Sequence, residues 1–405
     1  MSQNFKPRGH KDIEAVVQWA IAGGKSLEIV GHGSKRLLGR PAQYDATLDL
    51  SGHAGVILYE PQELVLSAKA GTPLAEITAL LASNGQELAF EPMDYGPLFG
   101  GAQGLGTVGG MLAANVSGPR RIRVGAARDH LLGVVAVSGR GETFKSGGRV
   151  VKNVTGFDLC KLLAGSWGTL GILAEVTLKV LPQAKAEATL VAFGMNDGTA
   201  AAAMAAAMAA PLGVSGAAHL PDYVASRFDG LDEAEASTVF RIDGIATPLD
   251  DCIASLKRTV RPFGAFATLD EAASRRLWRA IRDVQPFWAN GPCGDRPLWR
   301  ISTTPSKGYE IAAKISPAAQ LFYDWAGGLM WVAPPATQDC GAGEIRHAVA
   351  AAGGYATLVR APAAVRASVA PFHPEAGALA TLTRRVKENF DPKGVLNPGR
   401  MWAGV

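Results

Sequence analysis

Cysteine is scarce in this sequence of 405 residues. The four cysteines are Cys160, Cys252, Cys293 and Cys340, and no two of them are spaced as C-x-x-C. A disulfide-bonded scaffold and a self-contained iron–sulfur site are therefore not expected. Isolated reduced thiols are typical of a cytoplasmic protein.

Long apolar runs and an excess of one charge are also missing. No stretch of 18 apolar residues is present, so we expect no transmembrane helix. The 40 basic and 36 acidic residues give a net charge of +4, and the basic residues form no long run, which argues against a nucleic-acid partner. Met1–His10 is polar and precedes no apolar segment, so we expect no secretory signal.

Glycine is abundant in three loops of the first half of the chain. They are Gly31–Lys35 (G-H-G-S-K), Gly104–Gly110 (G-L-G-T-V-G-G) and Gly165–Ile172 (G-S-W-G-T-L-G-I). Glycine lets the backbone approach a ligand closely and point several N–H groups toward it. One such loop suits a phosphate, whereas three suit an extended, anionic dinucleotide.

A nicotinamide-binding Rossmann fold does not explain these loops. Gly104–Gly109 matches G-x-G-x-x-G, but no strand precedes it and the following Met111–Val116 is only long enough for two helical turns. The P-loop pattern of nucleotide triphosphatases is absent. A cofactor laid between the loops fits better, because Gly31–Lys35 follows a predicted strand and Gly109-Gly110 opens a short helix whose N-terminus favours an anion.

Hydrophobic periodicity and turn signals predict alternating helices and strands. The expected helices are Ile13–Ala22, Pro73–Ser83, an alanine-rich helix between Asn196-Asp197 and Pro211, Leu249–Val260 and Leu382–Phe390. The expected strands are Leu27–Val30, Val56–Tyr59, Leu64–Ala68, Leu88–Phe90, Val134–Ser138, Thr143–Lys145, Leu173–Val180, Ala188–Gly194 and Thr238–Ile245. Residues 91–129 form a long loop region of the kind that is usually functional, and Phe287–Pro305 suggests an irregular surface or interface segment.

Seven segments occur in a fixed order along the chain. They are Ile29–Lys35 (I-V-G-H-G-S-K), Thr107–Asn115 (T-V-G-G-M-L-A-A-N), Gly118–Arg121 (G-P-R-R), Val124–Gly133 (V-G-A-A-R-D-H-L-L-G), Lys152–Leu159 (K-N-V-T-G-F-D-L), Gly165–Ile172 and Asp391–Arg400 (D-P-K-G-V-L-N-P-G-R). This series resembles the FAD-binding domain of the vanillyl-alcohol-oxidase (PCMH-type) flavoprotein family. Within that family it is most similar to the FAD-binding subunits of bacterial glycolate oxidase complexes.

The resemblance implies an α+β fold with a PCMH-type FAD-binding domain of two subdomains and a smaller, ferredoxin-like cap domain. We expect the FAD-binding domain at residues 1–182, the cap or partner domain at 183–380 and a C-terminal return segment at 381–405. The implied cofactor-binding residues are Gly31, His32, Gly33, Ser34, Lys35, Thr107, Gly109, Gly110, Ala114, Asn115, Gly118, Gly125, Asp129, Gly168, Thr169, Gly171, Ile172, Asn397 and Arg400. Where some members carry a flavin-linking histidine, this sequence has Gly33, with His32 one position earlier, so we expect non-covalent FAD.

The sequence does not identify catalytic residues. Family members that oxidise 2-hydroxy acids carry a downstream set of histidines and acids with an H-x-H-type pair, but only three histidines follow residue 182 here, without that spacing. They are His219, His347 and His373, and we expect no metal site from them. Oxidation of a 2-hydroxy acid needs a base for the hydroxyl proton and cations for the carboxylate. Arg276, Arg279, Arg282 and Arg300 are candidate cations, and His373 is the candidate for the base.

The resemblance therefore implies a subunit of a complex that oxidises glycolate or another 2-hydroxy acid. A homologous FAD subunit would carry out the substrate chemistry, and an iron–sulfur subunit would pass electrons to an acceptor other than oxygen. A free-standing FAD-dependent dehydrogenase of a 2-hydroxy acid or alcohol and a flavin-free scaffold are the alternatives. We expect a cytoplasmic location, or attachment to the inner membrane through partners. The tryptophans Trp278, Trp288, Trp299, Trp325 and Trp331 would be either partner contacts or cap-domain core.

Overall fold

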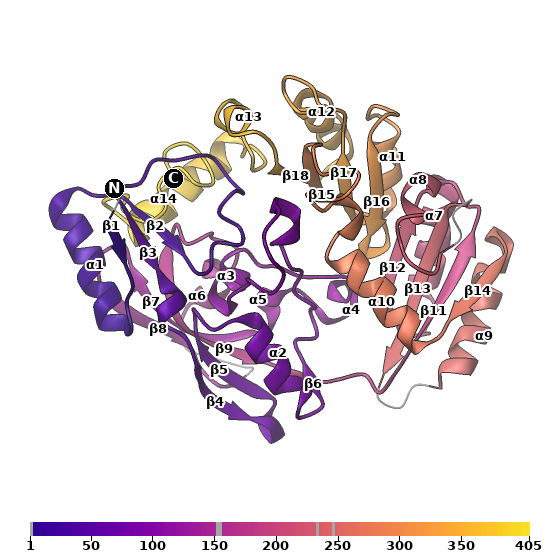
Figure 1. The fold of residues 1–405 in the computed structure, drawn as a ribbon, viewed down its shortest axis with the longest axis horizontal. Coiled ribbons are helices and arrows are strands. Elements are labelled where there is room, and N and C mark those ends of the chain that lie inside the picture. Colours follow the sequence, from indigo (N-terminus) through magenta and orange to yellow (C-terminus); the bar gives the residue numbers. More distant parts are fainter. Residues whose placement is uncertain (1–2, 151–155, 232–234, 245–247) are drawn as a thin grey trace.

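The computed structural model describes residues 3–150, 156–231, 235–244 and 248–405. Figure 1 shows two lobes side by side. The first lobe contains strands β1–β10 and the C-terminal helix α14, and the second contains strands β11–β18. The chain crosses between them just after Pro182, where β10 ends. Of the motif Lys152–Leu159, the first four residues lie outside the described residues, as does Ile245 of a predicted strand.

Two larger sheets build most of the first lobe. In sheet order, the parallel sheet contains β1 (Gln3–Phe5), β3 (Ala46–Asp49) and β2 (Leu27–Val30), and the antiparallel sheet contains β4 (Val56–Glu60), β5 (Val65–Lys69), β9 (Gly171–Lys179), β7 (Leu131–Ser138) and β8 (Thr143–Gly147). Helix α1 (His10–Gly23) contains the predicted helix Ile13–Ala22 and buries Ile13, Val17 and Ala20. Its Ile13 and Val17 lie in one core with Leu48 of the parallel sheet and Ile172 of the antiparallel sheet, so the two sheets share this core.

Short helices interrupt the glycine-rich region between these strands. They are α2 (Leu74–Ala82), α3 (Val108–Ala113), α4 (Arg121–Val124), α5 (Ala127–His130) and α6 (Leu159–Leu163). The predicted strand Leu88–Phe90 is wrong, because the paired residues are β6 (Gln86–Glu87), which pairs with β10 (Leu181–Pro182). Leu88 and Phe90 are apolar because they enter the core from a turn.

The second lobe consists of two ferredoxin-like units, so the predicted topology is confirmed and occurs twice. The first unit contains β11 (Ala186–Phe193), α7 (Asp197–Ala209), β12 (Val214–Leu220), β13 (Ser237–Gly244), α9 (Leu249–Val260) and β14 (Phe266–Leu269). The second contains β15 (Leu298–Ser302), α11 (Gly308–Ala312), β16 (Gln320–Asp324), β17 (Leu329–Ala333), α12 (Ala342–Ala352) and β18 (Tyr355–Arg360). Their strands form one sheet in the order β14-β11-β13-β12-β16-β17-β15-β18, so the second strand of one unit pairs with the second strand of the other.

Local signals explain part of this lobe. Asn196 caps α7 as predicted, since its side-chain oxygen accepts a hydrogen bond from the backbone N–H of Thr199 at 2.9 Å. The amphipathic helix α10 (Glu271–Arg282) connects the two units. The interpretation of Phe287–Pro305 as an irregular surface or interface segment is wrong at Leu298–Ser302, which is β15, an inner strand of the sheet, whereas residues 288–297 are irregular as predicted.

The tryptophans belong to the interior. Trp278, Trp299, Trp325 and Trp331 are buried and Trp288 is partly buried, so the partner-contact interpretation is wrong and the core interpretation is right. In Trp299 the indole N–H donates to the carbonyl of Cys340 at 2.8 Å. Buried indoles keep their polar N–H satisfied in this way.

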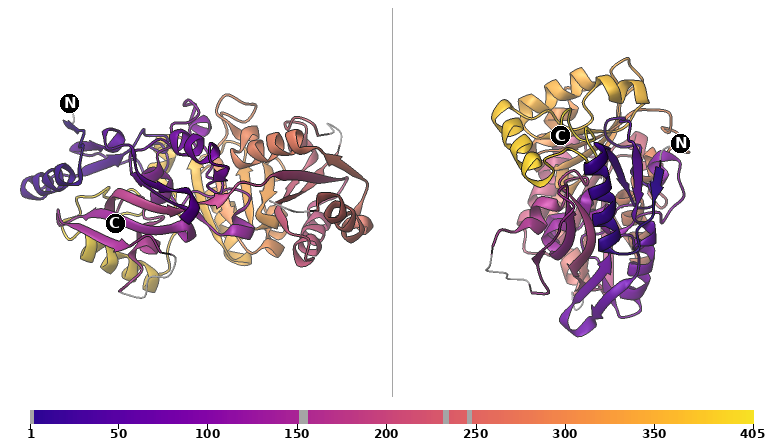
Figure 2. Two further views of the ribbon diagram at one scale, coloured as in Figure 1. Left: turned by 90° about the horizontal axis from the view of Figure 1, so that it is seen from below. Right: turned by 90° about the vertical axis from the view of Figure 1, so that its left-hand side faces the viewer.

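The C-terminal residues return to the first lobe, where Figure 2 shows them in yellow beside its strands. After α13 (Ala363–Ser368), helix α14 (Gly377–Phe390) begins five residues before the predicted start. Leu396 then forms a parallel bridge with Leu27 of β2. None of the helices in the described part of the chain is both long and apolar enough to cross a membrane.

Candidate cofactor site

Three neighbouring cavities lie where the predicted glycine loops meet. The loop cavity, of about 70 Å³, is lined by Gly31–Lys35, Thr107, Gly110 and Arg400. The inner cavity, of about 60 Å³, is lined by Gly109, Gly168, Gly171, Ile172 and Asn397. The interface cavity, of about 260 Å³, is lined by residues of both lobes, among them Ala114, Asn115 and Arg300. Trp167 lines all three, so the cavities follow one another along a single seam.

Glycine is required at this seam by close packing. A Cβ atom on Gly31 would lie 2.5 Å from Oγ1 of Thr107, and one on Gly109 would lie 2.6 Å from the Cβ of Ala70. Gly33 has nothing within 4 Å but holds a positive φ of 76°. Gly31 and Gly109 thus let β2, β5 and α3 converge, and Gly33 turns the loop that faces the cavity.

Three cations line the loop cavity, and one of them, Arg36, is paired with Glu28, which leaves Lys35 and Arg400. Arg400, which is 7% exposed, donates from Nη2 to the carbonyl of Lys35 at 2.8 Å. Burial and the charge of Arg400 lower the pKa of Lys35 to about 8. Within the described residues neither side chain has a carboxylate in ion-pair contact, which leaves this pocket positive.

The C-terminal motif is held against this seam by a buried ion pair. Lys387 donates from Nζ to Asp391 at 2.6 Å, to the carbonyl of Thr169 at 2.8 Å and to that of Leu396 at 2.9 Å. Asn397, with a positive φ of 43°, accepts from the N–H of Ile29 and donates to the carbonyl of Trp167, each at 2.8 Å. The amide of Asn397 therefore links β2 to the third glycine loop.

Four predicted residues do not line these cavities. The carbonyl of Gly118 accepts a hydrogen bond from the indole of Trp325 at 2.9 Å. Asp129 caps α5 by accepting from the N–H of Ala126 at 2.8 Å, and Gly125 packs against it. Thr169 is buried and bonds the carbonyl of Ser166. These four residues therefore pack against or cap elements around the seam.

The four candidate cations differ in their positions and partners. Arg276 and Arg279 are exposed on α10, and Arg282 forms an ion pair with Asp283 at 2.6 Å. Only Arg300 of the four lines the interface cavity. The candidate base His373 lies outside that cavity's lining, where its Nδ1 contacts the guanidinium of Arg346 at 2.8 Å, and burial lowers its pKa.

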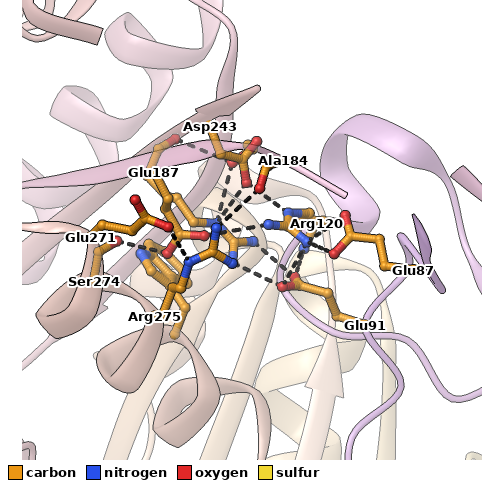
Figure 3. A network of polar contacts seen from close by, with 12 residues as sticks. Glu87, Glu91, Arg120, Ala184, Glu187, Asp243, Glu271, Ser274 and Arg275 are labelled. Carbon is orange, nitrogen blue, oxygen red and sulfur yellow. Dashed lines mark hydrogen bonds and ion pairs between the residues drawn. The ribbon is translucent and has the colours of Figure 1, made fainter. Parts of the chain in front are cut away.

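A buried ionic network joins the two lobes (Figure 3) and was not anticipated from the sequence. Arg120 of the first lobe contacts Asp243 at 2.7 Å and Glu87 at 3.0 Å. Glu91 binds both ends of the Arg241 guanidinium at 2.8 and 2.9 Å. These arginines hold the pKa of Glu91 down at about 2. The only sequence signal was the G-P-R-R motif, and nothing in it indicated a partner over 100 residues away.

A larger cavity, of about 680 Å³, adjoins this network. It is lined by α2, by charged residues that include Glu91, Arg120 and Arg282, and by Trp288. This larger cavity shares Lys35 with the loop cavity and Tyr95 with the interface cavity. Tyr95 and Trp167 were not among the expected site residues, although Trp167 lies within the third glycine loop.

Comparison with known proteins places this architecture in a family. A model of the FAD binding domain matches residues 2–147. Glycolate oxidase subunit GlcE of Escherichia coli (strain K12) is 34% identical over 388 residues, which cover 96% of this chain and 95% of that protein. Glycolate oxidase subunit GlcD of Bacillus subtilis (strain 168) is 35% identical over 108 residues, which cover 27% of this chain and 23% of that protein.

A solved structure shows the same fold. Substrate-bound p-cresol methylhydroxylase superposes with a TM-score of 0.73, covering 99% of this chain and 88% of that one, at 12% identity. At that identity the likeness concerns the fold alone, and it confirms the PCMH-type architecture predicted from the motifs. The chain belongs to the family of glycolate oxidase subunit GlcE, within the FAD-binding oxidoreductases.

Proposed function

We propose that this protein is the FAD-binding subunit of a glycolate-oxidising complex, and that it passes electrons through partner subunits to an acceptor other than oxygen. The observation that carries the proposal is the similarity to GlcE over nearly the whole of both chains. The shorter similarity to GlcD supports a homologous FAD subunit as one partner. An iron–sulfur subunit is the second partner of the proposal, because this chain has no cysteine spacing for a cluster of its own.

The residues along the seam suit FAD. The positive pocket at Lys35 and Arg400 would bind the pyrophosphate, and the N–H groups of the Gly31–Lys35 loop would add hydrogen bonds. The backbone at Gly109, Gly168 and Gly171 would contact the cofactor without side chains in the way. When bound, FAD supplies a flavin ring that accepts two electrons and a proton equivalent from a substrate.

We further propose that FAD is held without a covalent bond. Gly33 occupies the position of the linking histidine, and it has no side chain that could react. His32, the neighbouring histidine, is exposed on the loop. Tight binding would therefore come from the two cations and the backbone of the seam.

A second candidate function, oxidation of a 2-hydroxy acid by this chain itself, is favoured by one observation. Arg300 lines the interface cavity next to Trp167, which also borders both smaller cavities. A substrate carboxylate could be bound there, beside the cofactor. Asp324, whose pKa burial raises to about 7, lies near Arg300, although it does not line the cavity.

Co-expression tests the proposed assembly. A tagged form of this chain is expressed with a GlcD-type subunit and an iron–sulfur subunit, and the retained proteins are identified together with glycolate-dependent reduction of a dye. We expect a stable complex, cytoplasmic or attached to the inner membrane through its partners, that loses activity when this chain is omitted. A chain that never retains the two partners, or a complex that is fully active without it, would contradict the proposal.

A further inference from the structure

Two arginines stack on one tryptophan at the boundary of the lobes. The guanidinium of Arg121, in α4 of the first lobe, lies 4.4 Å from the ring centroid of Trp325, and that of Arg300, in β15 of the second lobe, lies 5.0 Å from it. Trp325 is itself fixed by its hydrogen bond to Gly118. Both arginines line the interface cavity.

Stacking leaves the edges of both guanidinium groups without acceptors. Each guanidinium has five N–H donors in its plane, whereas the indole contacts only its face. Within the described residues, neither side chain has a hydrogen bond or an ion pair, although Arg120, Arg241 and Arg282 nearby all have carboxylate partners. Burial and the charge of Arg300 lower the pKa of Arg121, and burial lowers the pKa of Arg300.

An unpaired cation in a partly buried position is costly, and natural proteins keep such groups chiefly where a ligand completes them. The nearby carboxyl of Asp324 forms no ion pair with either arginine, and it accepts from the N–H of Trp325 at 2.7 Å. The hydroxyl-bearing residues Tyr95 and Thr357 line the same cavity. The cavity thus offers two guanidinium groups and two hydroxyls in about 260 Å³, which suits a small, oxygen-rich anion.

We propose that Arg121 and Arg300 together form a binding site for a small carboxylate, with Tyr95 and Thr357 placed to bond a hydroxyl next to it. Guanidinium groups bind carboxylates through paired N–H···O bonds, which gives both strength and orientation. The inference rests on the proposed function, because glycolate is such a carboxylate. It deepens the second candidate function, which placed a carboxylate at Arg300 alone, because the site is now made by one arginine from each lobe.

Oxalate, an unreactive small dicarboxylate, is the probe. The purified flavin-containing protein is titrated with oxalate by calorimetry, and the flavin absorption is followed in parallel. We expect Arg300→Gln and Arg121→Gln each to weaken oxalate binding about tenfold or more, because each removes one charged hydrogen-bonding partner. The matched control is Arg279→Gln on the exposed face of α10, which should leave binding unchanged.

The two arginine variants lie in different lobes, so a folding defect in one leaves the other as a test. No oxalate binding by the wild type, or equal binding by both arginine variants and the control, would overturn the site. Loss of flavin with unchanged oxalate affinity would also overturn it, since the arginines would then serve the cofactor. A flavin-free wild-type protein would instead count against the proposed function, and its calorimetric titration would still decide the carboxylate site.

Discussion

Glu91 offers a direct test of the ionic network between the lobes. Its carboxylate binds Arg241 through two hydrogen bonds and lies 3.4 Å from the guanidinium of Arg120. These contacts lower its pKa from 4.5 to about 2, which corresponds to about 3 kcal/mol of folded-state stabilisation at pH 7. We therefore expect Glu91→Gln to lower the free energy of unfolding by about 3 kcal/mol at pH 7.

The direction in which this stabilisation changes with pH follows from the lowered pKa of Glu91. A depressed carboxyl pKa stabilises the fold above the unfolded pKa, and this stabilisation is lost as the pH falls toward the folded pKa. The difference between wild type and Glu91→Gln should thus shrink to about 2 kcal/mol at pH 3.5. Urea denaturation, followed by the fluorescence of the buried tryptophans, measures both values.

Glu271→Gln is the matched control, since Glu271 forms an exposed pair with Arg275 on α10. Such a pair contributes only about 0.5 kcal/mol. Two results would refute the assignment of Glu91 as a charged, paired group in the network. The free energy of unfolding of Glu91→Gln would lie within about 0.5 kcal/mol of the wild-type value at pH 7, or the difference between the two would grow as the pH fell.

Three further predictions concern the cofactor seam. Between pH 7 and pH 9, FAD affinity should fall about tenfold as Lys35 loses its proton, and equilibrium titration should find this dependence abolished in Lys35→Gln. Gly109→Ala should reduce the flavin content of the purified protein, because its Cβ would press α3 away from Ala70, whereas Gly377→Ala, with open space around it, should bind flavin normally. Lys387→Met leaves the carboxylate of Asp391 buried without its cation. The free energy of unfolding, measured by thermal unfolding, should therefore fall by about 3–5 kcal/mol, and the flavin content should fall with it. An unchanged unfolding midpoint would argue against the buried pair.

Short-range signals account for what the sequence predicted correctly. The apolar face of α1, the Asn196 cap of α7 and the glycine turns each depend on residues only a few positions apart. The seven ordered motifs were specific enough to predict the fold and the cofactor. The positions of individual site residues stay predictions, and for Gly31 and Gly109 the structure shows a packing requirement that a sequence pattern does not distinguish from contact with a ligand.

Long-range contacts explain what the sequence did not show. The second ferredoxin-like unit begins in a segment rich in tryptophan, proline and glycine, where β15 is too short to produce a clear alternation. Trp299 looked available for a partner, yet the sheet buries it completely. Likewise, the pairing of Glu91 with Arg241 and the meeting of Arg121 with Arg300 arise only when the two lobes come together.

The absorption spectrum of the purified protein, taken before and after acid precipitation, tests the central claim most directly. FAD held by the seam without a covalent bond should give a flavin spectrum whose yellow colour passes into the supernatant. Anaerobic glycolate, added to the native protein, then shows whether this chain reduces its own flavin or needs its partners. Colour retained in the pellet would contradict the reading of Gly33 and His32, and a protein that binds no flavin at all would contradict the account of the seam as a cofactor site.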